Sequence, residues 1–268
     1  MRVRGGPATV IPMPHAATGR ERGKPENPPE AILLTLCTRM QGVELFRETS
    51  HQLRANMADT TPVWERVRGM VPVSLCDWPG RITCVLFAGG CNLRCPTCHN
   101  ASLAWNWASL PGLEKSAVLA DLRRRKRWLD GITLSGGEPT CLASLDELLA
   151  DLASTGLPVK LDSNGTAPHV LERLLAAGLV QAVAVDVKGP WAMYPELTGQ
   201  GMAAGAARDA LAEVFALARA YPGQVYFRCT KVPDLTAADL ETTRAQVPGD
   251  LPLHFQDYVE PRSGDDFS

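Results

Sequence analysis

Three cysteines lie within eight positions of the chain, at Cys91, Cys95 and Cys98. With this C-x3-C-x2-C spacing, three thiolates on one loop can hold an iron–sulfur cube and leave its fourth iron without a protein ligand. Cys98 and His99 could instead complete a Cys3His zinc site, and the stretch from Cys95 to His99 also has the C-x-x-C-H pattern of covalent haem attachment. We expect an open iron–sulfur cluster on this loop, with zinc as the main alternative.

Polar or glycine-containing signatures also follow apolar runs farther along the chain. Gly136 and Gly137 lack side chains, so the backbone there can approach a ligand closely, and the Glu138 carboxylate suits an ammonium group. Asp186 and Lys188 end a hydrophobic run, where charges must be paired or solvated. A ligand that carries both an acid and an amine would satisfy them. The alternatives are a strand-to-helix turn at the glycines and a structural ion pair between the two charges.

Neutral hydrogen-bonding groups follow a further apolar run, at Ser163 and Asn164. The dipeptide Asn164-Gly165 is equally typical of a turn. His254 lies in the last apolar run, where a single histidine is more often a satisfied core residue than a ligand. We therefore place His254 below the other candidates.

Apolar or β-branched runs alternate from Arg81 onward with amphipathic stretches of helical length, which is typical of a parallel α/β architecture. The carboxyl ends of parallel strands form the ligand face of such folds, so the signatures should meet in one site. The sequence predicts an incomplete (β/α)6 TIM-like barrel of parallel strands, with a doubly wound open sheet as the alternative. The predicted strands are Ile82 to Ala88, Gly131 to Leu134, Val159 to Asp162, Ala182 to Val187, Gln224 to Thr230 and Leu253 to Asp257; the predicted helices are Leu113 to Leu129, Leu145 to Ser154, His169 to Ala177, Ala206 to Ala220 and Ala237 to Gln246.

The chain has 268 residues, and its 27 basic and 29 acidic side chains give a net charge of −2. This balance gives no reason to expect a nucleic-acid partner. No apolar run approaches the roughly 20 residues of a membrane span, so no membrane association is expected. Three of the eight cysteines are clustered at metal spacing and the others occur singly, which favours a reducing cytoplasm.

Six prolines interrupt a polar, Arg-rich segment at the start of the chain, which is typical of a disordered extension over residues 1–60. We expect this extension to be dispensable for the chemistry, and Met57 could be the native start. The organised domain is predicted over residues 61–262 and is followed by a short tail over residues 263–268.

Taken together, the cysteine spacing, the Gly-Gly-Glu-Pro motif and the strand-end signatures resemble the radical S-adenosylmethionine (SAM) superfamily from Val73 to Pro261. Within that superfamily, the stretches from Asp77 to Arg81 and from Cys98 to Asn100 resemble the glycyl radical enzyme activases. The stretches from Ser74 to Gly80 and from Tyr194 to Gly199 are most similar to the anaerobic ribonucleoside-triphosphate reductase activating proteins.

The resemblance implies that Cys91, Cys95 and Cys98 hold a [4Fe-4S] cluster whose open iron is chelated by the amino and carboxylate groups of SAM. The position before the third cysteine is usually aromatic in the family and packs near the adenine, but here it is Thr97. His254 is placed near the nucleoside. The full set of expected SAM contacts is Thr97, His99, Gly136, Gly137, Glu138, Ser163, Asn164, Asp186, Lys188 and His254.

The reaction implied by the resemblance is reductive cleavage of SAM to methionine and a 5'-deoxyadenosyl radical, which abstracts hydrogen from a glycine of a partner glycyl radical enzyme. The implied partner is an anaerobic ribonucleotide reductase, and the implied electron donor is of the flavodoxin or ferredoxin type. The chain itself would supply positioning and exclusion of water, because the cofactor carries the hard chemistry. Two other functions stay open: a radical SAM enzyme acting on a small molecule such as a deazapurine precursor, and a non-catalytic iron–sulfur or zinc protein.

Overall fold

The computed structural model describes residues 61–260. The predicted extension over residues 1–60 lies outside the described residues, as does the predicted tail over residues 263–268. The described part contains a seven-stranded sheet whose spatial order follows the sequence. Its strands are β1 (Val67–Ser74), β2 (Thr83–Ala88), β3 (Gly131–Gly136), β4 (Val159–Ser163), β5 (Ala182–Asp186), β6 (Val225–Lys231) and β7 (Leu253–Asp257).

Strands β2 to β7 are parallel, and each pairs with the strand that follows it in the chain. A doubly wound sheet would reverse its strand order at a switch point, whereas this order runs without reversal. The prediction of six parallel strands in an incomplete (β/α)6 arrangement is therefore confirmed.

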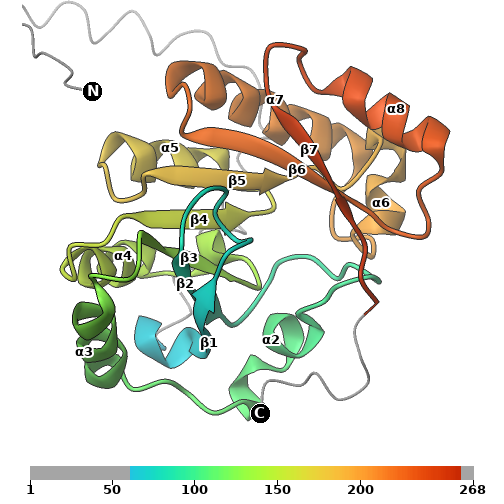
Figure 1. Ribbon diagram of the computed structural model, residues 1–268. Helices are drawn as coiled ribbons and strands as arrows, with labels where there is room; N and C mark the ends of the chain where they lie inside the picture. Colours follow the sequence, from blue (N-terminus) through green and yellow to red (C-terminus); the bar gives the residue numbers. More distant parts are fainter. Residues whose placement is uncertain (1–60, 261–268) are drawn as a thin grey trace, which may run out of the picture. The chain divides into compact units, whose positions relative to one another are not determined.

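Helices connect the parallel strands and follow one another along one side of the sheet (Figure 1). In α4, for example, Leu145, Leu148, Leu149 and Leu152 are buried because their spacing places them on one face of the helix. The longer helices are α3 (Lys115–Arg125), α4 (Leu145–Ala153), α5 (Pro168–Ala176), α7 (Ala204–Ala220) and α8 (Ala237–Gln246); the shorter elements are α2 (Ala101–Trp105), α6 (Tyr194–Leu197) and the 3-10 helices η2 (Val63–Arg66), η3 (Trp107–Ser109), η4 (Pro139–Cys141) and η5 (Trp191–Met193).

Strand β1 is absent from the sequence-based prediction, which has no strand before Ile82. It pairs antiparallel with β2, and Val67 lies opposite Ala88. Gly69 and Pro72 interrupt the apolar alternation that would indicate a strand, and the residues from 71 to 73 are exposed. Because β1 is an edge strand, a proline that cannot donate to a neighbouring strand is tolerated there.

The two faces of the parallel sheet differ in composition. Successive side chains of a strand point to opposite faces, and one set belongs to the hydrophobic core that includes the buried residues of α4, α5 and α7. We name this helix-covered side the outer face and the opposite side the inner face. On β4, β5 and β6 the outer face carries Val159, Leu161, Val183, Val185, Val225 and Phe227, and the inner face carries Lys160, Asp162, Ala184, Asp186, Tyr226 and Arg228.

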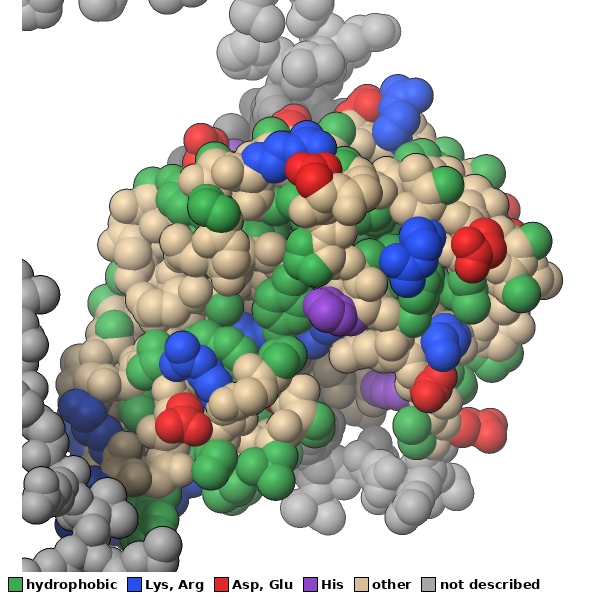
Figure 2. Space-filling view, turned by 45° about the horizontal axis from the view of Figure 1, so that its top comes forward, with side chains coloured by type: hydrophobic (Ala, Val, Ile, Leu, Met, Phe, Trp, Pro, Cys, Tyr) green, Lys and Arg blue, Asp and Glu red, His purple; other side chains and the backbone are tan. Residues whose placement is uncertain are grey.

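The surface of the described part mixes charges of both signs. On the side shown in Figure 2, Lys and Arg side chains are interspersed with Asp and Glu, and no large patch has a single sign. This mixture agrees with the net charge of −2. No helix in residues 61–260 combines the length and the apolar character that a membrane crossing needs.

Candidate active site

The cysteine loop starts a few residues after β2 ends and is fixed to its surroundings by backbone hydrogen bonds. Gly90 N–H donates to the carbonyl of Leu103 in α2 at 2.8 Å. Farther along the loop, Arg94 N–H donates to the carbonyl of Thr198, just after α6, at 3.1 Å. Two elements that are distant in sequence therefore hold the loop over the carboxyl ends of the strands, where the sequence places the site.

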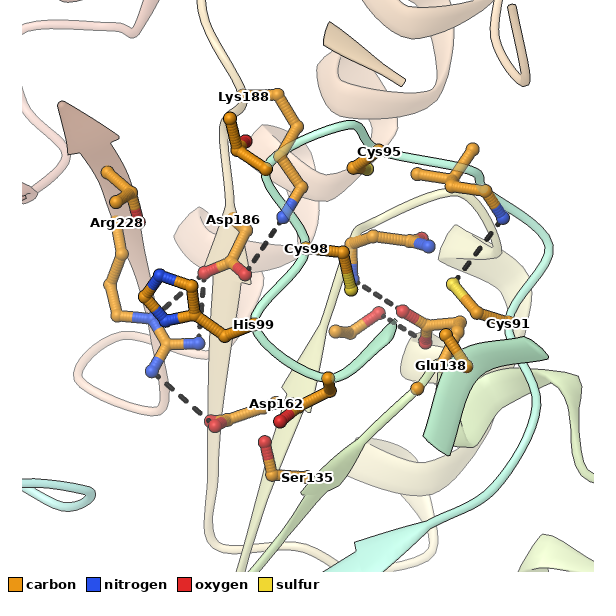
Figure 3. Close-up of a pocket in the computed structure, with 18 of the residues that line it drawn as sticks. Cys91, Cys95, Cys98, His99, Ser135, Glu138, Asp162, Asp186, Lys188 and Arg228 are labelled. Atoms are coloured by element: carbon orange, nitrogen blue, oxygen red, sulfur yellow. Dashed lines mark hydrogen bonds and ion pairs between the residues drawn. The ribbon is translucent and has the colours of Figure 1, made fainter. Parts of the chain in front are cut away.

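All three cysteines line one cavity of about 290 Å³ (Figure 3). The strand-end signatures after β3, β4 and β5 line the same cavity, as the parallel architecture predicts. Nine of the ten expected SAM contacts lie in its wall: Thr97, His99, Gly136, Gly137, Glu138, Ser163, Asn164, Asp186 and Lys188.

The three thiols on this loop are a donor set that fits an iron–sulfur cluster. A tetrahedral zinc would bind all of its thiolates at one metal ion, with Zn–S bonds of about 2.3 Å. A cube instead places each thiolate on a different iron. Burial raises the pKa of the Cys91 thiol to about 11, so metal binding there must displace a proton.

His99 does not join the thiols as a fourth ligand. Its ring lies against Tyr258, with the ring centroids 5.0 Å apart. Both residues line the cavity, and Tyr258 follows the end of β7. His99, the residue after the third cysteine, therefore forms part of the cavity wall.

The two glycines at the end of β3, Gly136 in the strand and Gly137 just after it, are required by the close approach of the ends of β2 and β3. Gly136 has a φ of +115°, and a Cβ atom added there would lie 2.4 Å from the carbonyl oxygen of Ala88. A Cβ added to Gly137 would lie 2.0 Å from the carbonyl oxygen of Gly90. Both distances are shorter than any side chain tolerates, so the motif also allows the cysteine loop to pack directly on β3.

Glu138 is almost completely buried, and four hydrogen bonds fix its carboxylate. Oε1 accepts from Thr140 N–H at 3.1 Å, from Thr140 Oγ1 at 2.6 Å and from Ser163 Oγ at 2.9 Å. Oε2 accepts from Asn164 N–H at 2.6 Å. Burial raises the pKa of Glu138, and these donors oppose that shift. Glu138 therefore joins the ends of β3 and β4. Its Oε1 accepts three hydrogen bonds from the protein and its Oε2 accepts one, so Oε2 has more capacity left for a ligand.

Asp186 and Lys188 form an ion pair at the end of β5, with Lys188 Nζ 3.2 Å from Asp186 Oδ2. Asp186 also binds Arg228 of β6, whose Nε lies 3.0 Å from Asp186 Oδ1. Burial opposes ionisation of Asp186, but Arg228 and Lys188 outweigh it and hold the pKa of this carboxyl well below its usual range. The pair therefore stays charged, with the opposite charges that a zwitterionic ligand end would meet.

One expected contact lies elsewhere. His254 is exposed on β7 and does not line the cavity, and its ring lies nearly perpendicular to that of Tyr226 with the centroids 6.0 Å apart. Sequence reasoning in turn did not select Arg228, Thr230 or Tyr258, which do line it. A signal for Arg228 exists in the sequence, because in β6 polar residues alternate with Val225 and Phe227 and so mark a polar inner face.

Comparison with protein families gives one match over most of the described residues. A model of the Radical SAM superfamily matches residues 85–247. The matched stretch runs from β2 to the end of α8 and contains the cysteine loop, the Gly-Gly-Glu motif and Arg228.

Curated relatives match a shorter stretch. A protein of Methanocaldococcus jannaschii that is named as a glycyl-radical enzyme activating enzyme is 37% identical over 131 residues, which are 48% of this chain and 53% of the relative. The anaerobic ribonucleoside-triphosphate reductase-activating protein of Salmonella typhi is 35% identical over 82 residues, or 30% of this chain and 52% of the relative. The 7-carboxy-7-deazaguanine synthase of Hyperthermus butylicus is 35% identical over 122 residues, or 41% of this chain and 51% of the relative.

The chain thus spans about half the length of the curated relatives it matches. Among solved structures, that of anSMEcpe with bound AdoMet has a TM-score of 0.48 and 20% sequence identity, and the match covers 67% of this chain and 52% of that one.

Proposed function

Because the chain belongs to the radical SAM superfamily, whose cofactors are a [4Fe-4S] cluster and SAM, we propose that it activates a glycyl radical enzyme. The partner that we propose is an anaerobic ribonucleotide reductase. The observation that carries the proposal is the meeting of the three cysteines, the Gly-Gly-Glu motif and the Asp186–Lys188 pair in one cavity. Relatives named for glycyl radical enzyme activation support the choice of substrate class.

Each group of residues has a separate task in this proposal. Cys91, Cys95 and Cys98 hold the cluster and leave one iron free of protein ligands. Asp186 and Lys188 present opposite charges to the amino and carboxylate groups of SAM, and the backbone at Gly136 and Gly137 lets that end lie close to the strands. When bound, the reduced cluster and SAM supply a 5'-deoxyadenosyl radical that removes one hydrogen atom from the glycine Cα, giving 5'-deoxyadenosine, methionine and a glycyl radical.

The electron comes from outside the chain, and we propose a flavodoxin or ferredoxin type donor in a reducing cytoplasm. All the cysteines among residues 61–260 are free thiols, which is consistent with that compartment. The second candidate is a radical SAM enzyme that acts on a deazapurine precursor, and the similarity to a 7-carboxy-7-deazaguanine synthase favours keeping it.

The test is anaerobic mixing of the reconstituted protein with SAM, dithionite and an anaerobic ribonucleotide reductase. We expect a glycyl radical signal by electron paramagnetic resonance and one 5'-deoxyadenosine for each radical formed. The variant Cys95→Ala should give neither product, because it removes one of the three cluster ligands. The exposed Cys76 provides the matched control, and Cys76→Ala should retain both products. Formation of 5'-deoxyadenosine with a deazapurine precursor, and no radical on the reductase, would instead establish the second candidate.

A further inference from the structure

Five charged side chains alternate in sign across the ends of β4, β5 and β6 (Figure 3 shows four of them). Lys160 donates to Asp162, Asp162 faces Arg228, Arg228 binds Asp186, and Asp186 binds Lys188. Lys160 is completely buried beneath the cavity, and the other four line it. This row of five charges, which we call the ladder, therefore extends from the interior of the sheet to the cavity wall.

Arg228 occupies the centre of the ladder and bridges two strands. Its Nε and Nη2 lie 3.0 and 2.9 Å from Asp186 Oδ1, and its Nη1 lies 3.5 Å from Asp162 Oδ2. Only 13% of the Arg228 side chain and 11% of the Asp162 side chain are exposed. Water therefore cannot replace this guanidinium at low cost as the partner of Asp162, whereas the Asp186 side chain is 31% exposed.

The strand register explains how one guanidinium reaches both carboxylates. Arg228 is opposite Asp186 on the neighbouring strand β5. Asp162 is one strand farther away on β4, where it is opposite Ala184. The short side chain of Ala184 leaves the inner face open, so Arg228 can extend across β5 to Asp162.

Electrostatics makes Arg228 the critical member of the ladder. Asp162 and Asp186 are like charges on adjacent strands, and each also has one lysine partner, Lys160 and Lys188 respectively. Among the ion pairs within residues 61–260, only those of Arg228 reach both carboxylates. Its guanidinium remains protonated at every relevant pH and donates in a fixed fork. Without it, the Asp162 and Asp186 carboxylates on adjacent strands would lack the positive charge between them, and a cation from solution could take its place.

We propose that Arg228 is a positioning residue, a counter-ion built into the chain that fixes Asp186, and through it Lys188, for the charged end of SAM. The site then needs no added cation to bind SAM. This inference rests on SAM binding in the proposed cavity, but it does not depend on the identity of the substrate. A measurement of SAM binding alone therefore tests the role of Arg228 without testing the activase function, so that failure of one proposal can be told from failure of the other.

The test compares Arg228→Gln with the wild-type protein, each loaded with its cluster and kept anaerobic without reductant. Isothermal titration calorimetry measures the dissociation constant of SAM in a buffer whose monovalent cation is tetramethylammonium, which is too large to fit between two carboxylates. We expect SAM binding to weaken by about tenfold or more in the variant, as is typical when a residue that orients a binding residue is removed. Millimolar guanidinium chloride or potassium chloride should restore binding in the variant and leave the wild-type value unchanged.

Arg219→Gln is the matched control, because Arg219 also binds an aspartate through two nitrogens. It lies 2.8 and 2.9 Å from the oxygens of Asp250, but on the exposed surface. SAM binding by this variant should stay within about twofold of the wild-type value, since surface ion pairs contribute little. Iron content and the thermal midpoint of each variant report whether the fold and the cluster are intact.

The proposal is overturned if Arg228→Gln binds SAM as tightly as the wild-type protein, or if its loss is restored by no cation. Arg228→Lys keeps the charge without the fork and should bind SAM more tightly than Arg228→Gln. If Arg228→Gln loses its cluster, SAM binding by Arg228→Lys is the deciding measurement. Tight SAM binding by Arg228→Lys, or weak binding that an added cation restores, supports the counter-ion role of Arg228. Weak SAM binding that no cation restores refutes it.

Discussion

The outer and inner faces of the same three strands have opposite compositions. On β6, Phe227 is fully buried in the core under the helices, and the next residue, Arg228, lines the cavity. On β4, Leu161 likewise packs in the core, and the next residue, Asp162, lines the cavity. Because side chains alternate along a strand, one short segment carries both the packing of the fold and the charges of the site.

The two faces also differ in their energetics. Burial of apolar side chains on the outer face is favourable at roughly 25 cal/mol for each Å² removed from water. Burying the ions of the inner face costs free energy that their mutual attraction often fails to recover, so replacing all of them together by well-packed apolar residues is often neutral or stabilising, whereas removing one partner leaves an uncompensated charge. We therefore propose that the ladder from Lys160 to Lys188 serves ligand binding, and neighbouring substitutions should separate stability from binding.

The largest effect on stability should come from the outer face. Phe227→Ala would remove a fully buried ring whose centroid lies 5.0 Å from that of Phe215. We expect it to lower the free energy of unfolding by about 3 to 5 kcal/mol, measured by urea denaturation, because it leaves a cavity in the core. Trp128→Ala removes a comparable aromatic side chain that is 74% exposed, and it should change the value by less than about 0.5 kcal/mol. Equal effects of the two variants would contradict the division between the faces.

A smaller effect, with a distinct pH dependence, should come from Lys160→Met on the inner face. We expect a loss of about 1 to 3 kcal/mol at neutral pH, because Asp162 loses one partner and keeps Arg228. In the wild-type protein, burial is the main cause that lowers the pKa of Lys160, and Asp162 opposes it. The unfolded chain, with a lysine pKa of about 10.4, then binds the proton more tightly than the folded chain does.

Between the lowered pKa and about 10.4, wild-type stability should therefore rise with pH, since the unfolded state binds more protons in that window. The Lys160→Met variant lacks the titrating group, so its free energy of unfolding should not show this rise with pH. Urea unfolding of both proteins at several pH values up to about 10 measures the difference between the two slopes. Parallel slopes would show that Lys160 titrates normally and that the inner face is more solvated than its burial indicates.

The outer face and the strand ends could be predicted from sequence, because both leave a local signal. Apolar runs bounded by Ser135-Gly136-Gly137 or Asp186-Val187-Lys188 indicate where a strand ends and which polar groups come after it. Strand β1 leaves no such signal, since Gly69 and Pro72 disrupt it. The role of Arg228 could not be predicted because it depends on register: Asp162 is 66 positions away along the chain, and only the pairing of β4, β5 and β6 brings the two together.

The smallest expected effect concerns His254, where the sequence-based expectation and the geometry differ. The resemblance places this residue near the nucleoside of SAM, whereas in the structure it is exposed on β7 and absent from the cavity wall. We expect His254→Ala to change the dissociation constant of SAM by less than about twofold, in line with other exposed positions that touch no ligand. Tyr258→Ala is the matched comparison, because its ring lines the cavity beside His99 and should have the larger effect. A large loss for His254→Ala, measured by the same calorimetry, would mean that β7 moves toward the cavity when SAM binds, and the inner face would then extend one strand farther than its present geometry indicates.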